Sequence, residues 1–243
     1  MRKFFLLLIP LLLSQYTFAA LCENTSTFNP AANDSWTGWG SNYFNTRLNN
    51  ADSNPVNASQ LDKLKLKWAF AFPDVRSVIG NPSIAGDRIF IGTETGEVYS
   101  MDVESGCVYW VFQADNGVRT TPLIEYVNDK WTVFFGDRSA NVYGIDANTG
   151  SQLWKVKVEE HGAAILTGAP QFVHLENEIV PDRLIIPVSS SEEGVAAAPT
   201  YACCSFRGSV VSLNANNGQQ LWKTYTIENE AVETEAGTFG PSG

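Results

Sequence analysis

The sequence predicts an all-β fold, a β-propeller of which this chain holds an incomplete part. Two observations carry the prediction. Each unit of about 40 residues contains four short alternating strands between turn residues, which is typical of a propeller blade. One pattern of strand, Asp or Asn, Gly and Trp also occurs three times: YSMDVESGCVYW (99–110), YGIDANTGSQLW (143–154) and VSLNANNGQQLW (211–222). Because a unit of this length cannot bury its apolar face alone, the copies must stack on one another.

The turn inside each repeat has a defined chemistry. An Asp or Asn side chain can accept hydrogen bonds from the turn backbone, and a Gly adopts the positive φ that ends the turn. A Trp follows on the outgoing strand, where its large ring can fill the gap between neighbouring sheets. The positions are Asp102, Gly106 and Trp110, then Asp146, Gly150 and Trp154, then Asn214, Gly218 and Trp222.

The blades follow an N-terminal segment, residues 20–60, that is rich in Asn and contains Pro. Residues 61–243 are predicted to form the partial propeller. Within it, we expect blades at about 76–113, 118–158 and 165–226. Trp68, in LKLKWAFAF, resembles one further outgoing strand. No segment with a helical period competes with this β pattern.

The blade count does not close a ring. The repeat tryptophans, counted from Trp68, lie 42, 44 and 68 residues apart, and an insertion, Ser191–Arg207, stretches the last interval. This gives three blades and one outer strand, whereas a propeller needs about 4–8 blades. We therefore expect either a truncated chain, with the C-terminal half missing, or a second chain that completes the ring.

Residues 1–19 are predicted to be a secretory signal peptide. Arg2 and Lys3 precede an apolar run, and Ala19 ends a small-residue cleavage site. The apolar run is too short for a membrane span, and Leu21 is bulky for lipid attachment at Cys22. We therefore expect a periplasmic or secreted protein without a membrane span.

The charge balance argues against two classes of partner. Acidic residues outnumber basic ones 26 to 16, which gives a formal net charge of −10. Removal of Arg2 and Lys3 with the signal peptide makes the charge more negative still. An acidic chain is repelled by nucleic acid and by anionic membranes, although a merely soluble acidic protein has the same balance.

Four cysteines in an exported chain indicate disulfides before metal ligands. Cys203 and Cys204 are neighbours, which leaves Cys22 and Cys107 to pair, although four cysteines allow three connectivities. A disulfide between neighbours closes a minimal loop and gives almost no entropic stabilisation, so it favours a functional role. Two free or separately bonded thiols are the alternative. The chain has no Cys-x-x-Cys-His motif for haem attachment.

Strand alternation predicts that one rim of the propeller carries the chemistry. The loop that opens each blade and the loop between its second and third strands lie on the same side. The unusual side chains fall in these loops: Arg76, Arg119, Thr167, Glu192, Glu193, Cys203, Cys204 and Arg207. They predict a concave, anion-accepting site with a carboxylate. The alternatives are a solvated loop cation at Arg119 and an exposed acidic pair at Glu192 and Glu193. His161 and His174 lack metal-ligand spacing.

The repeats resemble the blades of eight-bladed pyrroloquinoline quinone (PQQ) dehydrogenases, in particular the polyvinyl-alcohol dehydrogenase-like quinoproteins. The similarity covers residues 36–243 and begins with a Trp36…Trp39-Gly40…Asn45-x-Arg47 motif. Non-enzymatic propellers of outer-membrane assembly share the repeats without requiring the site positions. A non-catalytic periplasmic binding or scaffold module is therefore the alternative function.

The resemblance implies roles for several residues. The Arg of Val-Arg-Thr (118–120) would bind a quinone carboxylate, and the Thr of Leu-Thr-Gly-Ala-Pro (166–170) would contact the cofactor. In the Ser-Ser-x-x-Glu motif of the family, the Glu ligates an active-site calcium, and a vicinal disulfide lies against the quinone. The implied cofactor-binding residues are Arg119, Thr167, Ser190, Cys203, Cys204 and Arg207, and the implied calcium ligand is Glu193.

The chain also departs from the family pattern. The cysteine pair lies one blade later than in the methanol dehydrogenase branch, and VIGNPS (78–83) has no equivalent of the cofactor-binding Glu of the first blade. The catalytic Asp, a second calcium ligand and the Trp floor belong to later blades. The resemblance thus implies the N-terminal part of a PQQ- and calcium-dependent alcohol dehydrogenase with an external acceptor such as a cytochrome. We expect this part alone to be inactive.

Overall fold

The computed structural model describes residues 20–23, 27–30, 35–41, 45–48, 58–175, 181–198, 200–201 and 203–230. The predicted signal peptide, residues 1–19, lies outside this part of the chain. A 3-10 helix, η1 (Ala58–Lys63), and a one-turn helix, α1 (Glu192–Val195), are the helical elements of the described residues. Neither these nor any other described segment is a helix with the length and hydropathy of a membrane span.

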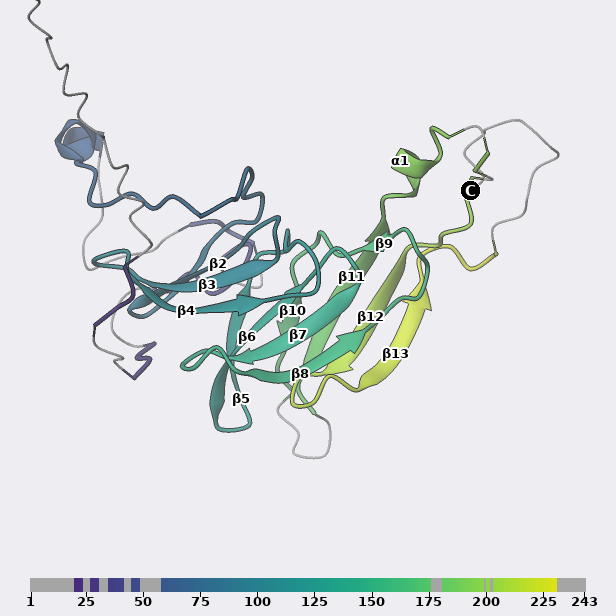
Figure 1. Ribbon diagram of the computed structural model, residues 1–243. Coiled ribbons are helices and arrows are strands. Elements are labelled where there is room, and N and C mark those ends of the chain that lie inside the picture. Colours follow the sequence, from purple (N-terminus) through teal and green to yellow (C-terminus); the bar gives the residue numbers. More distant parts are fainter. Residues whose placement is uncertain are drawn as a thin grey trace, which may run out of the picture.

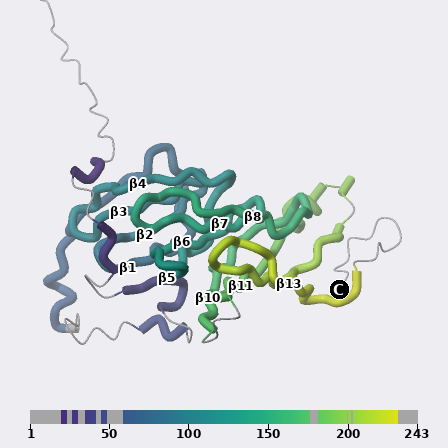
Figure 2. The backbone as a smooth tube through the Cα atoms, turned by 90° about the horizontal axis from the view of Figure 1, so that it is seen from below, coloured from purple at the N-terminus to yellow at the C-terminus, as the bar shows by residue number. Residues whose placement is uncertain are grey.

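Three antiparallel sheets follow one another along the chain (Figures 1 and 2). The first sheet contains β1 (Ser83–Ala85), β2 (Arg88–Gly92), β3 (Glu97–Asp102) and β4 (Val108–Gln113). The second contains β5 (Leu123–Val127), β6 (Lys130–Gly136), β7 (Asn141–Asp146) and β8 (Gln152–Lys157). The third contains β10 (Gln171–Val173), β11 (Arg183–Ser190), β12 (Ser209–Asn214) and β13 (Gln220–Tyr225). The all-β prediction and the partial propeller are confirmed.

Three local features differ from the expected strand pattern. A short strand, β9 (Ala164–Ile165), pairs with the end of β11 and extends the third sheet. The insertion after β11 begins with the one-turn helix α1, where no helix was expected. Residues 64–72, which contain Trp68, have no assigned strand, although the Trp68 ring takes the place expected of an outer-strand tryptophan.

Two apolar layers fill the gaps between the sheets. Strand β5 contacts both β1 and β10, so the first strands of successive sheets are neighbours. Alternation sends successive side chains to opposite faces of a strand: on β6, Phe135 belongs to the layer with Phe90 and Trp110, whereas Phe134 belongs to the layer with Leu184. Burial of each such side chain contributes about 1.5–3 kcal/mol, so stacking of the sheets stabilises the fold.

The repeat tryptophans make one contact three times. Each indole N–H donates to the backbone carbonyl that follows the Asp or Asn of the next turn. These bonds join Trp68 Nε1 to Val103 O at 2.9 Å, Trp110 Nε1 to Ala147 O at 3.0 Å and Trp154 Nε1 to Ala215 O at 3.1 Å. Trp222, the fourth, is 39% exposed, and no described blade follows it. The same hydrogen bond, from an indole N–H to a backbone carbonyl, therefore joins each of these tryptophans to the blade that follows it.

The glycines of these turns are required by two constraints at once. Gly218 has a φ of +74°, and a Cβ on it would lie 2.6 Å from a carbon of the Trp154 ring. Gly150 repeats both features against Trp110. A side chain would therefore meet both backbone strain and overlap with the indole.

The N-terminal segment is tied to the first and second sheets. The disulfide Cys22–Cys107 fixes it beside the start of β4, which resolves the pairing that the sequence left open.

Arg88, on β2, joins the first two blades. It is 1% exposed and donates to the carbonyls of Ala147 and Asn148 at 3.0 and 2.9 Å. Burial lowers the pKa of Arg88, and these carbonyls of the second blade accept from its guanidinium and join the second blade to the first.

Candidate functional site

The opening loops and the inter-strand loops lie on one rim, as the alternation predicts. Backbone hydrogen bonds connect them in succession, from Arg138 N to Gly117 O at 3.0 Å, from Leu166 N to Asp137 O at 3.2 Å and from Ser191 N to Ala163 O at 2.8 Å. Figure 1 shows β9 and α1 at the end of the sheets toward which the β13 arrow points, opposite the repeat turns. We call this the loop rim and the opposite side the turn rim.

Arg119 occupies the opening loop of the second blade. Its side chain is partly buried, and its buried Nε has no hydrogen-bond partner among the described residues. The adjacent Thr120 holds the loop, because its buried Oγ1 donates to Gly136 O at 3.0 Å and accepts from Gly136 N at 2.9 Å. A guanidinium donor with an unused N–H in a fixed loop suits a carboxylate ligand.

The predicted hydroxyl groups meet where β9 pairs with the end of β11. Ser190 lies opposite Ala164 in this pairing. The exposed Thr167 has its Oγ1 3.2 Å from Ser189 Oγ, and Ser190 Oγ accepts from Glu192 N at 3.4 Å. The extra strand thus brings Thr167 and Ser190 to the same corner of the loop rim.

The two neighbouring glutamates have opposite environments. Glu192 is 3% exposed, and its carboxylate accepts from Ser205 N at 2.7 Å, Phe206 N at 3.0 Å and Tyr201 Oη at 2.8 Å. Burial alone would raise the pKa of Glu192, but these donors together hold it below its ordinary value. Glu193 is exposed. Glu192 is therefore an internal anchor, and Glu193 has the carboxylate that remains available to a ligand.

Cys203 and Cys204 form a disulfide across a cis peptide bond. Their sulfurs and a carboxylate oxygen of Glu192 all lie within 4.8 Å of one another. Three such ligands in one place resemble a metal site. The sulfurs are bonded to each other, however, and the carboxylate is occupied by its donors, so this trio is not a calcium site, which needs several available oxygens.

Arg207 is held by the end of β13 and by the segment that follows it. Its guanidinium carbon stacks 3.8 Å from the centre of the Tyr225 ring, and its Nη1 donates to Glu228 O at 2.9 Å. A polar cavity of about 240 Å³ lies here, lined also by His161 and Phe206. Arg207 therefore has fewer unused donors than Arg119.

His161 does not activate its neighbouring hydroxyl. Its Nδ1 accepts from Ala163 N at 3.1 Å, so the proton of the neutral ring lies on Nε2, which lies 3.1 Å from Ser205 Oγ. A base must accept the hydroxyl proton. In this tautomer Nε2 donates instead, so the His161 and Ser205 pair is not a nucleophile with its base.

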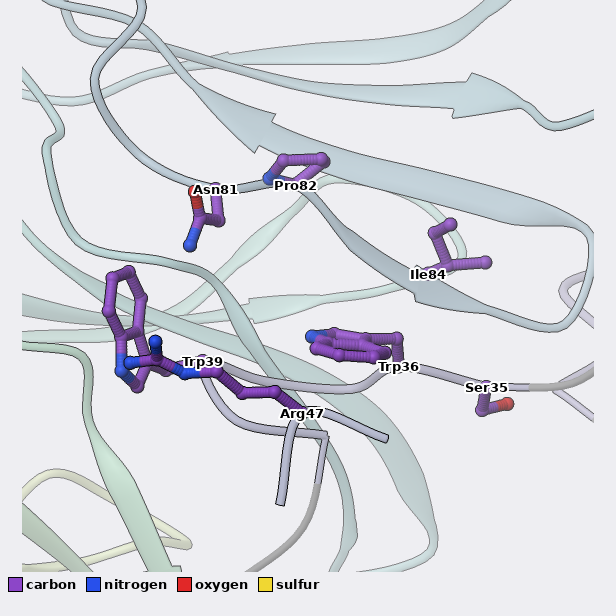
Figure 3. A pocket seen from close by; sticks show the side chains of 7 residues that line it. All are labelled: Ser35, Trp36, Trp39, Arg47, Asn81, Pro82 and Ile84. Carbon is purple, nitrogen blue, oxygen red and sulfur yellow. The ribbon is translucent and has the colours of Figure 1, made fainter. Parts of the chain in front are cut away.

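A separate, aromatic cavity of about 470 Å³ lies beside the first strand of the first blade (Figure 3). Trp36 pairs with Ile84 of β1 through backbone hydrogen bonds of 2.7 and 2.9 Å. Arg47 stacks over the Trp39 ring at 5.2 Å, and Asn81 lies across the cavity from Trp36 in Figure 3. The motif that began the family resemblance thus folds against the inner edge of the blades.

A second, smaller cavity, which shares Trp39 with the first, contains an unusual carboxyl group. Glu125, on β5, lines about 180 Å³ together with Trp39 and Phe172. Burial, assisted by the negative charge of Asp182, raises the pKa of Glu125 to about 7. The group therefore titrates near neutrality, but the described residues place no predicted site residue beside it.

The structure thus gathers most, though not all, of the predicted site. Ser190 and the disulfide share one corner with Glu192. Thr167 contacts Ser189, the neighbour of Ser190 on β11, and Arg207 follows the disulfide in the chain. Arg119 belongs to the neighbouring opening loop, with no contact to that corner among the interactions of the described residues. Sequence reasoning missed the donors that hold Glu192: Tyr201, Ser205 and Phe206. Their only signal was their position within the same insertion.

Comparison with known proteins gives the family. Residues 65–238 match the PQQ_2 family model, described as outer membrane protein assembly factor BamB. The chain belongs to the PQQ_2 family. This PQQ_2 chain is 35% identical over 235 residues to the polyvinylalcohol dehydrogenase of Sphingopyxis sp. (strain 113P3), covering 93% of this chain and 34% of that protein. A polyvinylalcohol dehydrogenase of Pseudomonas sp is 34% identical over 212 residues, covering 85% and 31%.

Solved structures agree on the fold. The quinohemoprotein alcohol dehydrogenase from Comamonas testosteroni superimposes with a TM-score of 0.60 at 19% identity, covering 82% of this chain and 28% of that one. The PQQ_2 chain therefore spans about a third of the length of the relatives that it matches. The resemblance to quinoprotein alcohol dehydrogenases of the polyvinyl-alcohol type is confirmed.

Proposed function

We propose that this chain forms the N-terminal arc of an exported, PQQ- and calcium-dependent dehydrogenase that oxidises alcohols of the polyvinyl alcohol type. The observation that carries the proposal is Arg119, which combines a family-matching Val-Arg-Thr motif with a buried, unpartnered Nε on the loop rim. Relatives named polyvinylalcohol dehydrogenase, at 35% and 34% identity, support the substrate class.

The donor set fits an anionic quinone. Arg119 would bind a quinone carboxylate through its unused N–H, and the hydroxyls of Thr167 and Ser190 would donate to quinone oxygens. Cys203 and Cys204 would present the disulfide surface to the ring, and Arg207 would add positive charge behind it. When bound, PQQ supplies the hydride acceptor for the alcohol carbon.

Calcium would bind at Glu193. Its exposed carboxylate is a hard oxygen ligand of the kind that calcium prefers, whereas Glu192 has its oxygens occupied by three donors. One carboxylate does not complete a coordination shell. The remaining ligands and the catalytic base would come from further blades, so the arc alone would not turn over.

Further blades would complete the ring, either from the C-terminal half or from a second chain. The support is Trp222, which is 39% exposed and makes, among the described residues, neither the glycine nor the carbonyl contact of the other three repeat tryptophans. Electrons would leave to an external acceptor such as a cytochrome. The two disulfides support an exported location, because such bonds persist in oxidising compartments.

A calorimetric titration of the purified chain with PQQ, in buffer that contains calcium, tests the proposal. We expect binding, and we expect Arg119→Gln to weaken it roughly tenfold to a hundredfold, since a charge-assisted hydrogen bond contributes about 1.5–3 kcal/mol. Arg138→Gln is the control, because Arg138 is exposed in the neighbouring β6–β7 loop. Absence of PQQ binding, or equal losses in the two variants, would overturn the assignment and favour the scaffold alternative.

A further inference from the structure

The buried carboxylate of Glu192 lies against the vicinal disulfide. One of its oxygens and both sulfurs lie within 4.8 Å of one another. The side chain is 3% exposed, so water screens its charge poorly. Its neighbour Glu193, one residue along the chain, is exposed. Substitution of Glu193 is therefore a matched control for substitution of Glu192.

Glu192 also connects the two ends of the insertion. It begins α1 directly after β11, and it accepts backbone N–H groups from Ser205 and Phe206, the two residues that follow the disulfide. Tyr201 donates its hydroxyl from the other side of the cysteines at 2.8 Å. The carboxylate thus fixes the chain on both sides of Cys203 and Cys204.

The charge beside the sulfurs has a chemical consequence. Reduction by a dithiol begins when a reagent thiolate attacks one sulfur, forming a mixed disulfide and breaking the Cys203–Cys204 bond with release of a cysteine thiolate. That thiolate takes up a proton, and the second reagent thiol then displaces the other cysteine as the reagent is oxidised to its own disulfide. A carboxylate beside the sulfurs disfavours both the approaching and the departing thiolate.

We propose that Glu192 is a positioning residue that holds the Cys203–Cys204 disulfide on the loop rim and that its negative charge keeps this disulfide oxidised against thiol reductants. The inference deepens the proposed function, because it explains how a disulfide surface is maintained at the cofactor site. Neither part of it requires PQQ to bind. Its test therefore uses the chain without cofactor.

The experiment measures reduction of the folded, purified chain by dithiothreitol, with thiol trapping and peptide mass spectrometry at each time point. We expect Glu192→Gln to speed reduction of Cys203–Cys204 by about tenfold, the factor that roughly one pKa unit of charge interaction gives. Glu193→Gln should reduce at the wild-type rate. The disulfide Cys22–Cys107 is an internal control and should be unchanged in both variants, which also shows that the fold is intact.

A second readout separates the charge from looser packing. In the reduced chain, the pH dependence of alkylation by iodoacetamide reports the thiol pKa values of Cys203 and Cys204. We expect these to fall in Glu192→Gln and to stay unchanged in Glu193→Gln. Faster reduction without lower thiol pKa values would overturn the proposal, as would equal effects of the two substitutions. PQQ binding that fails in every variant would count against the proposed function and leave this inference standing.

Discussion

The two rims of the propeller are built in different ways. On the turn rim, Asp102, Asp146 and Asn214 accept hydrogen bonds from backbone N–H groups two or three residues further on, and a tryptophan from the preceding blade or outer strand closes each turn. On the loop rim the backbone contacts also recur, as from Val118 N to Thr93 O at 2.8 Å and from Leu166 N to Asp137 O at 3.2 Å, but the side chains differ from one loop to the next. The turn rim therefore determines how blades stack, and the loop rim is where blades acquire different chemistry.

The largest expected effect concerns the stacking contact. Trp154→Ala removes a ring that is 8% exposed and leaves a cavity between two sheets, so we expect a loss of about 3–5 kcal/mol in the free energy of unfolding. Trp222→Ala removes a ring that is 39% exposed and should cost less than about 1 kcal/mol. Urea unfolding followed by circular dichroism gives both values. Equal losses would show that stacking does not decide the stability of the turn rim.

Glycines extend the comparison to both rims. Gly218→Ala combines a φ of +74° with a Cβ 2.6 Å from the Trp154 ring, so we expect a loss of about 2–4 kcal/mol. Gly194→Ala, in α1 of the loop rim, meets nothing within 4 Å and should change the free energy by less than about 1 kcal/mol. Chemical denaturation of both variants is the measurement. A costly Gly194→Ala would contradict the difference between the rims.

A pH series examines the loop rim itself. The pKa of Glu192 is lowered in the folded chain, so its stabilisation is present above the unfolded pKa and is lost as the pH falls through the folded pKa. Glu192→Gln should cost about 1–2 kcal/mol near pH 7, with the difference from wild type shrinking below about pH 4.5. Thermal unfolding across pH measures this. Glu193→Gln removes an exposed carboxylate and should cost less than about 1 kcal/mol near pH 7, and a loss as large as that of Glu192→Gln would contradict the assignment of Glu192 as the anchor.

The smallest effect belongs to the turn hydrogen bonds. Asp146 Oδ1 accepts from Asn148 N and Thr149 N, both at 2.9 Å, in an exposed turn. Asp146→Ala should cost about 1 kcal/mol, which corresponds to a fall of roughly 2–4 °C in Tm for a chain of this size. Scanning calorimetry detects such a shift. If Tm fell as much as in Trp154→Ala, the turn hydrogen bonds, and not the stacking of the tryptophans, would be the main source of stability on the turn rim.

The sequence predicted the turn rim well because its Asp or Asn, Gly and Trp recur at a fixed spacing in every repeat. The spacing between Gly150 and Trp154 fixes the glycine in the turn and the tryptophan on the strand that follows, so the positions of both could be predicted from the repeat. The loop rim was predicted only as a set of residues that share one side. Alternation along β11 stops at Ser190, two residues before α1 begins, and it therefore could not decide which of Glu192 and Glu193 is buried.

Two further features required three-dimensional information. Burial of Arg88 depends on carbonyl acceptors about sixty residues away, at Ala147 and Asn148, and no local pattern reports them. The short strand β9 forms because it meets the end of β11, since two residues have too little intrinsic preference to form a strand alone. The place of Trp68 was correct although its segment has no assigned strand.

The most direct test of the account compares PQQ affinity between one variant from each rim. We expect Asp146→Ala, although less stable, to bind PQQ with the wild-type Kd. Arg119→Gln should unfold like the wild type and bind PQQ at least about tenfold more weakly. The opposite pattern, with affinity lost at the turn and kept at Arg119, would contradict the assignment of stability to one rim and cofactor binding to the other.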